Sequence, residues 1–175
     1  MTLLQRLQGL SEKWGYPFVL IGGHAVNIHG YSRMTADIDI MVRRNDLAEW
    51  KDALAGLGYE AEYEAGPFAQ FTATGSNGPR LDLMLVNEST FEKIARRAAT
   101  TRYLEATINA VCVEHLIALK LHVLRQDLEH RRLKDFLDVV ELVKVNQVDL
   151  QSAEMQEIFA RYGTEDLLRR IKLAL

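Results

Sequence analysis

Residues 19–25 read VLIGGHA and residues 35–42 read TADIDIMV. In the first stretch a short apolar run, rich in β-branched residues, stops at the pair Gly22-Gly23, which is typical of a buried strand that ends in a turn. A short helix is predicted from His24 to His29, and the second stretch resumes as an apolar strand. The pattern therefore predicts a strand–helix–strand unit, with candidate functional residues in the turn after the first strand and in the second strand.

Two aspartates, one residue apart, lie within this second predicted strand. Residues i and i+2 of a strand point to the same face, so we expect Asp37 and Asp39 to stand side by side while Ile38 packs on the other face. Adjacent carboxylates repel each other when both are ionised, and a divalent cation with oxygen ligands relieves that repulsion. The pair predicts a metal site, and the alternative is a solvated strand face.

A third acid, Asp82, lies in another apolar strand predicted over residues 80–86, after a turn predicted at residues 75–79. The leucines of this strand alternate to one face and Asp82 falls on the other. If the strand lies beside the first pair of aspartates, three carboxylates converge, hold one or two Mg²⁺ ions and activate an attacking hydroxyl. The alternative is a lone strand acid that pairs with Arg80 or Arg33.

The glycine pair and the loop after it are candidates for phosphate binding. Gly22 and Gly23 allow a backbone to approach phosphate oxygens, with N–H groups of the following helix as donors. The plain alternative is a strand-to-helix turn. Arg33 lies between the glycine pair and the aspartates, where it can reach a phosphate or remain an ordinary surface arginine.

Two lysines of the C-terminal half are further candidates. Lys120 lies among aliphatic residues of a helix predicted over residues 114–125, so its ammonium group can face a cleft and hold a triphosphate. The alternative is a helix lysine that extends to solvent. Lys134 begins another predicted helix, together with Asp135 and Asp138. These three residues orient Lys120 or the substrate, or they form an ordinary set of helix salt bridges.

Length and composition bound the class of protein. The chain has 175 residues, 48% of them hydrophobic, and a formal net charge of −3. These values favour one folded domain, or one domain with a helical appendage, and give no support for broad attraction to nucleic acid or membranes. The pattern turns helical near residue 112, so we predict a mixed α/β core over residues 1–112 and a helical part over residues 113–175 packed on it.

Other features exclude several kinds of site. The single cysteine, Cys112, rules out an intrachain disulfide and is expected to be a small buried residue rather than a nucleophile. The histidines lack the spacing of a zinc site. No apolar run approaches the roughly 20 residues that span a bilayer, and the N-terminus lacks a secretion signal. We expect a cytoplasmic protein with no membrane partner.

Together these motifs resemble a known superfamily. The pattern G-G-H-A-x-x-x-H-G-x-x-R-x-T-x-D-I-D, then L-I-A-L-K-L, then K-D-F-L-D-V, resembles the polymerase-beta-like nucleotidyltransferases. Within that superfamily it looks like the small bacterial proteins grouped with the AbiEii-type toxin nucleotidyltransferases. The resemblance covers residues 18–142.

The resemblance implies an α+β fold, with a mixed β-sheet flanked by helices and a C-terminal helical bundle. It also implies two-metal transfer of a nucleoside monophosphate (NMP) from a nucleoside triphosphate (NTP), using Mg²⁺ or alternatively Mn²⁺. In this view the metal is bound by three acids, Asp37, Asp39 and Asp82, the last of which is also the candidate base. The implied phosphate contacts are Gly22, Gly23, Arg33, Lys120 and Lys134.

These features leave three candidate functions. The first is an active nucleotidyltransferase that acts on an RNA such as tRNA, a protein or a small molecule, within a toxin–antitoxin or phage-defence pair. The second is a non-catalytic NTP-binding or antitoxin-like module that docks on a partner protein. A Mg²⁺-dependent phosphohydrolase is disfavoured, because the chain shows no His-Asp metal set for a hydrolytic water.

Overall fold

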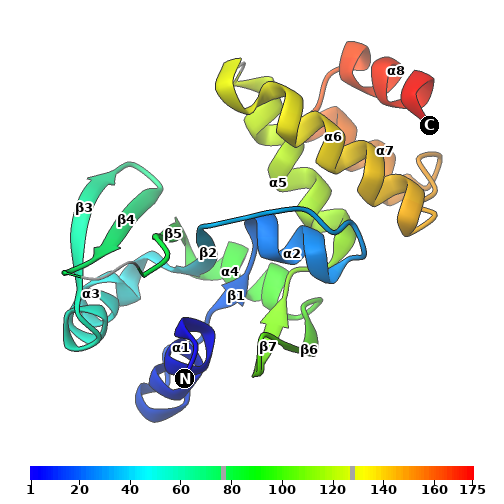
Figure 1. Cartoon of the computed structure of the whole chain (residues 1–175). Coiled ribbons are helices and arrows are strands. Elements are labelled where there is room, and N and C mark those ends of the chain that lie inside the picture. Colours follow the sequence, from blue (N-terminus) through cyan, green and yellow to red (C-terminus); the bar gives the residue numbers. More distant parts are fainter. Residues whose placement is uncertain (76–77, 127–128) are drawn as a thin grey trace. The chain divides into compact units, whose positions relative to one another are not determined.

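A computed structural model of the chain describes residues 1–75, 78–126 and 129–175, without the side chains of residues 129–132. It contains a seven-stranded mixed sheet and flanking helices, which confirms the predicted α+β class (Figure 1). The chain forms two compact units. One comprises residues 1–25 and 34–111, and the other comprises residues 26–33 and 112–175.

The first unit is built on the sheet, whose strand order is β3-β4-β5-β2-β1-β7-β6. Its strands are β1 (Val19–Leu20), β2 (Ile38–Arg43), β3 (Tyr59–Ala65), β4 (Phe68–Ala73), β5 (Leu81–Val86), β6 (Ala99–Tyr103) and β7 (Ala106–Ala110). Its helices are α1 (Leu3–Trp14), α3 (Leu47–Gly56) and α4 (Glu88–Ala95), with a 3₁₀ turn η1 (Arg44–Asp46) before α3. A further helix, α2 (Gly22–Ile28), begins in this unit and ends in the other.

The central strands form the core of the first unit because their sequences are almost continuously apolar. β2 pairs in parallel with β5 and antiparallel with β1, and Leu20, Ile40 and Leu83 of these three strands are fully buried. Helices α1 and α4 pack against β7 and β2, respectively. The polar side chains of β2 and β5 are thereby confined to the strand face that the leucines do not occupy.

Two local predictions differ from the structure. The glycine pair opens α2 and does not precede it, and Asp37 lies in a bend just before β2 and not within it. The turn between β6 and β7 falls at Leu104 and Glu105. Both turn residues have positive φ, 44° and 65°, without the glycine or asparagine that normally indicates such a hairpin. Residues 76 and 77 of the predicted turn at 75–79 lie outside the described residues.

The second unit is helical, as the apolar periodicity predicted. Beyond the C-terminal half of α2 it contains α5 (Val113–Arg125), α6 (Glu129–Val145), α7 (Ala153–Tyr162) and α8 (Glu165–Ala174). Figure 1 shows these four helices in colours from lime to red, and α5 packs against both α6 and α7. Thr164 caps α8, since its hydroxyl accepts a hydrogen bond from the Leu167 amide. None of the helices in the described ranges is long and apolar enough to cross a membrane.

The prediction that Cys112 is buried is wrong. Its side chain is half-buried, because the residue occupies the N-cap position of α5, where the chain leaves β7. An N-cap residue lies at the end of a helix and not within its packed face, which accounts for the partial exposure.

Candidate functional site

The first feature of the site is the register of two neighbouring strands. β2 and β5 run parallel, and Asp39 of β2 lies directly opposite Asp82 of β5. Paired residues on adjacent strands point to the same face, with their strands about 4.8 Å apart. The leucines of β5 are buried on the opposite face, so the alternation predicted for this strand is confirmed. The fold thus brings together two acids that lie far apart in the chain, with α3 and the β3–β4 hairpin between them.

The glycine at the start of α2 lies against one of these acids. The Ile21 amide donates to the Asp39 carbonyl at 3.0 Å, which holds the end of β1 beside β2. A Cβ atom placed on Gly22 would lie 2.0 Å from the Asp39 carboxylate oxygen Oδ2, and Gly22 has a φ of +65°. Only glycine satisfies both the close approach and the left-handed backbone. The glycine therefore has a steric role here, beside its predicted role in phosphate binding.

The electrostatics of the acid pair are unfavourable without a cation. Burial, together with the charges of Asp39 and Asp37, raises the pKa of Asp82 to about 6, against smaller lowering effects of Arg80 and of a hydrogen bond with Gln70. The Asp82 Oδ1 atom is buried and has no hydrogen-bond partner among the described residues. A carboxylate held in this state is suited to bind a cation or to accept a proton.

The acids fit a magnesium ion as a pair and not as a closed cage. Asp37 is exposed in the bend just before β2, so only Asp39 of the pair lies within the strand, but the charges of both acids raise the pKa of Asp82. In the part of the chain that the structure describes, no group of three or more His, Cys, Asp or Glu side chains is arranged to hold a metal. Mg²⁺ is commonly bound by one or two carboxylates together with substrate phosphates, and Asp39 and Asp82 match that donor set. The metal role of all three acids stays a prediction.

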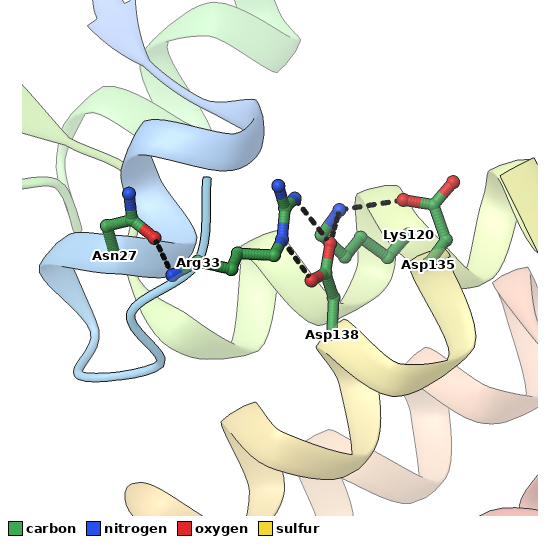
Figure 2. Close-up of polar contacts among 5 residues, drawn as sticks. All are labelled: Asn27, Arg33, Lys120, Asp135 and Asp138. Atoms are coloured by element: carbon green, nitrogen blue, oxygen red, sulfur yellow. Dashed lines mark hydrogen bonds and ion pairs between the residues drawn. The ribbon is translucent and has the colours of Figure 1, made fainter. Parts of the chain in front are cut away.

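The second unit contains a buried cluster of four charged residues, drawn in Figure 2. Lys120 of α5 extends its ammonium group between two carboxylates of α6, with Nζ at 2.8 Å from Asp135 Oδ1 and 2.6 Å from Asp138 Oδ2. Arg33 donates to the same Asp138 through two nitrogens, Nε at 2.6 Å from Oδ1 and Nη2 at 2.8 Å from Oδ2. The cluster pairs two positive with two negative groups.

Burial makes this cluster tightly coupled. The side chain of Asp138 is 0% exposed and that of Lys120 is 7% exposed. Burial by itself would raise the pKa of Asp138, but hydrogen bonds and charges from Arg33 and Lys120 outweigh it and hold that pKa below its ordinary value. Lys134 is exposed on the surface of α6. Lys120 is buried and forms salt bridges with Asp135 and Asp138, so it does not extend to solvent. The phosphate roles of Arg33, Lys120 and Lys134 stay predictions.

Two further residues of the first unit make contacts that had no signal in the sequence. Gln70 of β4 lies opposite Asp82 in the antiparallel β4–β5 pair. Tyr103, at the end of β6, places its hydroxyl 2.9 Å from Nδ1 of His24, in the first turn of α2. Neither pairing could be inferred from local pattern, because each depends on the order of the strands in the sheet.

Comparison with solved structures identifies the fold. A structure of ANT(2")-Ia in complex with adenylyl-2"-tobramycin is 12% identical, with a TM-score of 0.65 over 92% of this chain and 97% of that chain. An antigenic nucleotidyltransferase-like protein from Paracoccidioides brasiliensis is 15% identical, with a TM-score of 0.59 over 97% and 90%. The lincosamide antibiotic adenylyltransferase LnuA, with lincomycin bound, is 18% identical, with a TM-score of 0.58 over 79% and 93%. These similarities establish a nucleotidyltransferase fold.

Comparison of the sequence itself identifies the family. No curated protein matches the chain. The family model described as nucleotidyl transferase AbiEii toxin, Type IV TA system, matches residues 5–175 and therefore includes both the acids of the sheet and the charged cluster of the helices. The resemblance seen in the sequence motifs is confirmed, and the chain belongs to the AbiEii nucleotidyltransferase toxin family.

Proposed function

We propose that this transferase moves an NMP from an NTP to an acceptor hydroxyl in a reaction that depends on Mg²⁺, with Mn²⁺ as a substitute. The observation that carries the proposal is the juxtaposition of Asp39 and Asp82 across β2 and β5, with Gly22 packed against the Asp39 carboxylate. Family membership supplies the reaction class. The metal requirement and the acceptor are the parts proposed here.

The residues of the first unit have two proposed roles, metal binding and phosphate binding. Asp39 and Asp82, with Asp37 from the preceding bend, would hold the cation, and the backbone of Gly22 and Gly23 would face the phosphates. The cation, when bound, neutralises charge on the phosphate oxygens and on the leaving group. The adjacent acids would also place fixed negative charge beside the reacting phosphorus. This charge would repel an NTP that arrives without its cation.

Asp82 is the candidate acceptor of the hydroxyl proton. The acceptor oxygen forms a bond to the α-phosphorus, the bond from that phosphorus to the bridging oxygen breaks, and pyrophosphate leaves. The proton of the hydroxyl passes to Asp82, the carboxylate that the sequence resemblance implies as the candidate base. The product is the acceptor with a phosphodiester-linked NMP.

The acceptor and the partner remain to be tested together. Two proteins of similar fold have adenylyl-tobramycin or lincomycin in their structures, and the family model is that of a toxin. We infer that this chain acts as the toxin of a pair and is countered by an antitoxin protein. RNA such as tRNA, a protein side chain and a small molecule are the three acceptor classes to be separated.

A labelling experiment tests this function. The purified chain is incubated with Mg²⁺ and each of four α-³²P NTPs, with total RNA, with RNase-treated lysate protein or with the small-molecule fraction of the lysate. The label is expected to move to one fraction with release of pyrophosphate, and EDTA is expected to stop the transfer. Asp39→Asn is the inactive variant, and Asp52→Asn on the exposed surface of α3 is the matched control. Transfer by Asp39→Asn at the wild-type rate, or no transfer by wild type to any fraction, would contradict the proposal.

A further inference from the structure

The connection between α2 and β2 is tied down at Arg33. Its backbone amide donates to the Asn27 side-chain oxygen at 2.9 Å, so the loop folds back on the end of α2. Its guanidinium group reaches the other way and makes two parallel hydrogen bonds to Asp138 of α6 (Figure 2). Two-nitrogen recognition of a carboxylate is geometrically demanding and fixes the direction of the arginine. The loop is thus held at both the backbone and the side chain of one residue.

Two further contacts hold the same loop on α6. The side-chain amide of Asn146 donates to the carbonyl of His29 at 3.0 Å. Gly30 has a φ of +93°, and a Cβ atom at this position would lie 2.8 Å from a methyl carbon of Val145. Residues 29–33 are therefore packed on the C-terminal part of α6 as well as bonded to it. Hydrogen bonds and close packing together leave this segment little conformational freedom.

The carboxylate that receives Arg33 is itself immobilised. Asp138 is fully buried, and Lys120 bonds it at 2.6 Å while bridging to Asp135 at 2.8 Å. The side chain of Arg33 is only 13% exposed. A nucleotide phosphate could take the two nitrogens that face Asp138 only by displacing a buried carboxylate, which would then lack one of its cations, and that is costly. The geometry favours a fixed ion-pair set over an open phosphate site.

We propose that Arg33 is a positioning residue of the transferase: held by Asp138, it fixes the segment that leads into Asp37 and Asp39, and it does not bind the nucleotide. Arg33 precedes Asp37 by four positions in the chain, and fully extended residues span at most about 3.5 Å each, so an anchored Arg33 limits the range of that acid. Small displacements of reacting groups cost up to about 100-fold in rate. The expected loss of rate rests on the proposed function. The expected anchoring of the segment rests on the geometry alone.

A double-mutant cycle separates positioning from nucleotide binding. The variants are Arg33→Gln, Asp138→Asn and the double substitution, and Arg169→Gln is the matched control. Arg169 lies in the same unit and pairs with Asp166 at 2.6 Å, but its side chain is 73% exposed. Each single substitution is expected to lower kcat about 10- to 100-fold, with KM for the NTP changed less than about threefold. The double variant should be no slower than the slower single variant, because both remove one contact.

Direct nucleotide binding gives the opposite pattern. Arg33→Gln would then raise KM for the NTP, and Asp138→Asn would leave it unchanged or lower it by releasing the guanidinium. The double variant would keep the raised KM of Arg33→Gln, because no guanidinium remains to be released. That result overturns the inference. Should Asp138→Asn fail to fold, Arg33→Lys replaces it, since lysine keeps the charge but loses the two-nitrogen geometry. Under positioning, Arg33→Lys lowers kcat at unchanged KM.

Hydrogen exchange gives a test that does not need activity. In Arg33→Gln the amides of residues 29–37 should exchange at least about tenfold faster than in wild type, while those of α7 stay protected. Arg169→Gln should change neither segment. Unchanged exchange over residues 29–37 overturns the inference whatever the kinetics show. Failure of wild type to transfer label, by contrast, overturns the proposed function and leaves the exchange result to decide the anchoring.

Discussion

Asp82→Asn is expected to make the metal-free protein more stable while it abolishes transfer. Asp82 is held beside Asp39 in a partly buried position, where its negative charge is unfavourable. Asparagine has nearly the same shape, keeps an oxygen for the contact with Gln70 and carries no charge. The substitution therefore removes an electrostatic cost without opening a cavity.

The magnitude follows from the pKa. The carboxyl of Asp82 has a pKa of about 6 in the folded chain, against 3.8 for an ordinary aspartate. Each pKa unit corresponds to about 1.36 kcal/mol, so keeping this group ionised costs the folded state at most about 3 kcal/mol. The folded state binds the proton more tightly than the unfolded state. The cost is therefore absent below pH 3.8, appears as the pH rises through the window between 3.8 and 6, and is complete above it.

Tryptophan fluorescence during urea unfolding measures this effect. Both tryptophans, Trp14 and Trp50, lie in the same unit as Asp82, and Trp50 is 1% exposed, so its emission reports the unfolding of that unit. With EDTA present, Asp82→Asn should be more stable than wild type by about 1–3 kcal/mol at pH 8 and by about a third of that difference at pH 4.5, which lies within the window where the cost develops. Asp52→Asn on α3 should show no such dependence on pH. An equal difference at both pH values, or a less stable variant at pH 8, would refute the reasoning.

Three further predictions concern glycine packing, the metal and the charged cluster. Gly22→Ala should abolish transfer and lower the free energy of unfolding by about 1–3 kcal/mol, because its Cβ would collide with Asp39 at a φ of +65°. The control, Gly9→Ala, lies in an open position within α1 and should instead raise the free energy of unfolding by about 0.5–1 kcal/mol. Equal effects of the two substitutions would contradict the prediction. Mg²⁺ at 100 times its Kd should stabilise wild type by about 2.7 kcal/mol and Asp39→Asn hardly at all, as followed by thermal melting; equal shifts would exclude a metal site at that acid. Lys120→Met should cost about 3–5 kcal/mol by circular dichroism, because two buried carboxylates lose a cation; adding Asp135→Asn should recover part of that loss, and a neutral effect of Lys120→Met would contradict the buried pairing.

Local sequence pattern was sufficient for the elements and for the reaction class. Apolar runs of strand length and helical periodicities placed β2, β5 and the helices α5 to α8, because burial of one face imposes a period that a single segment already shows. The acids within apolar strands, Asp39 and Asp82, were conspicuous for the same reason. The turn at Leu104 and Glu105 has no comparable signal, because neither residue type indicates the positive φ that it adopts.

The tertiary structure decided which of these residues meet. The parallel register of β2 and β5 sets Asp39 opposite Asp82, and the order of strands places Gly22 against Asp39; neither follows from spacing along the chain. Arg33 and Asp138 are 105 positions apart, so only the fold could show that the arginine is bonded to a buried carboxylate. The sequence by itself determined the strand–glycine–helix–acid pattern and hence the family, because these depend on neighbours in the chain. The charge state of Asp82 and the partners of Arg33 and Lys120 depend on burial and on distant groups, which only packing determines.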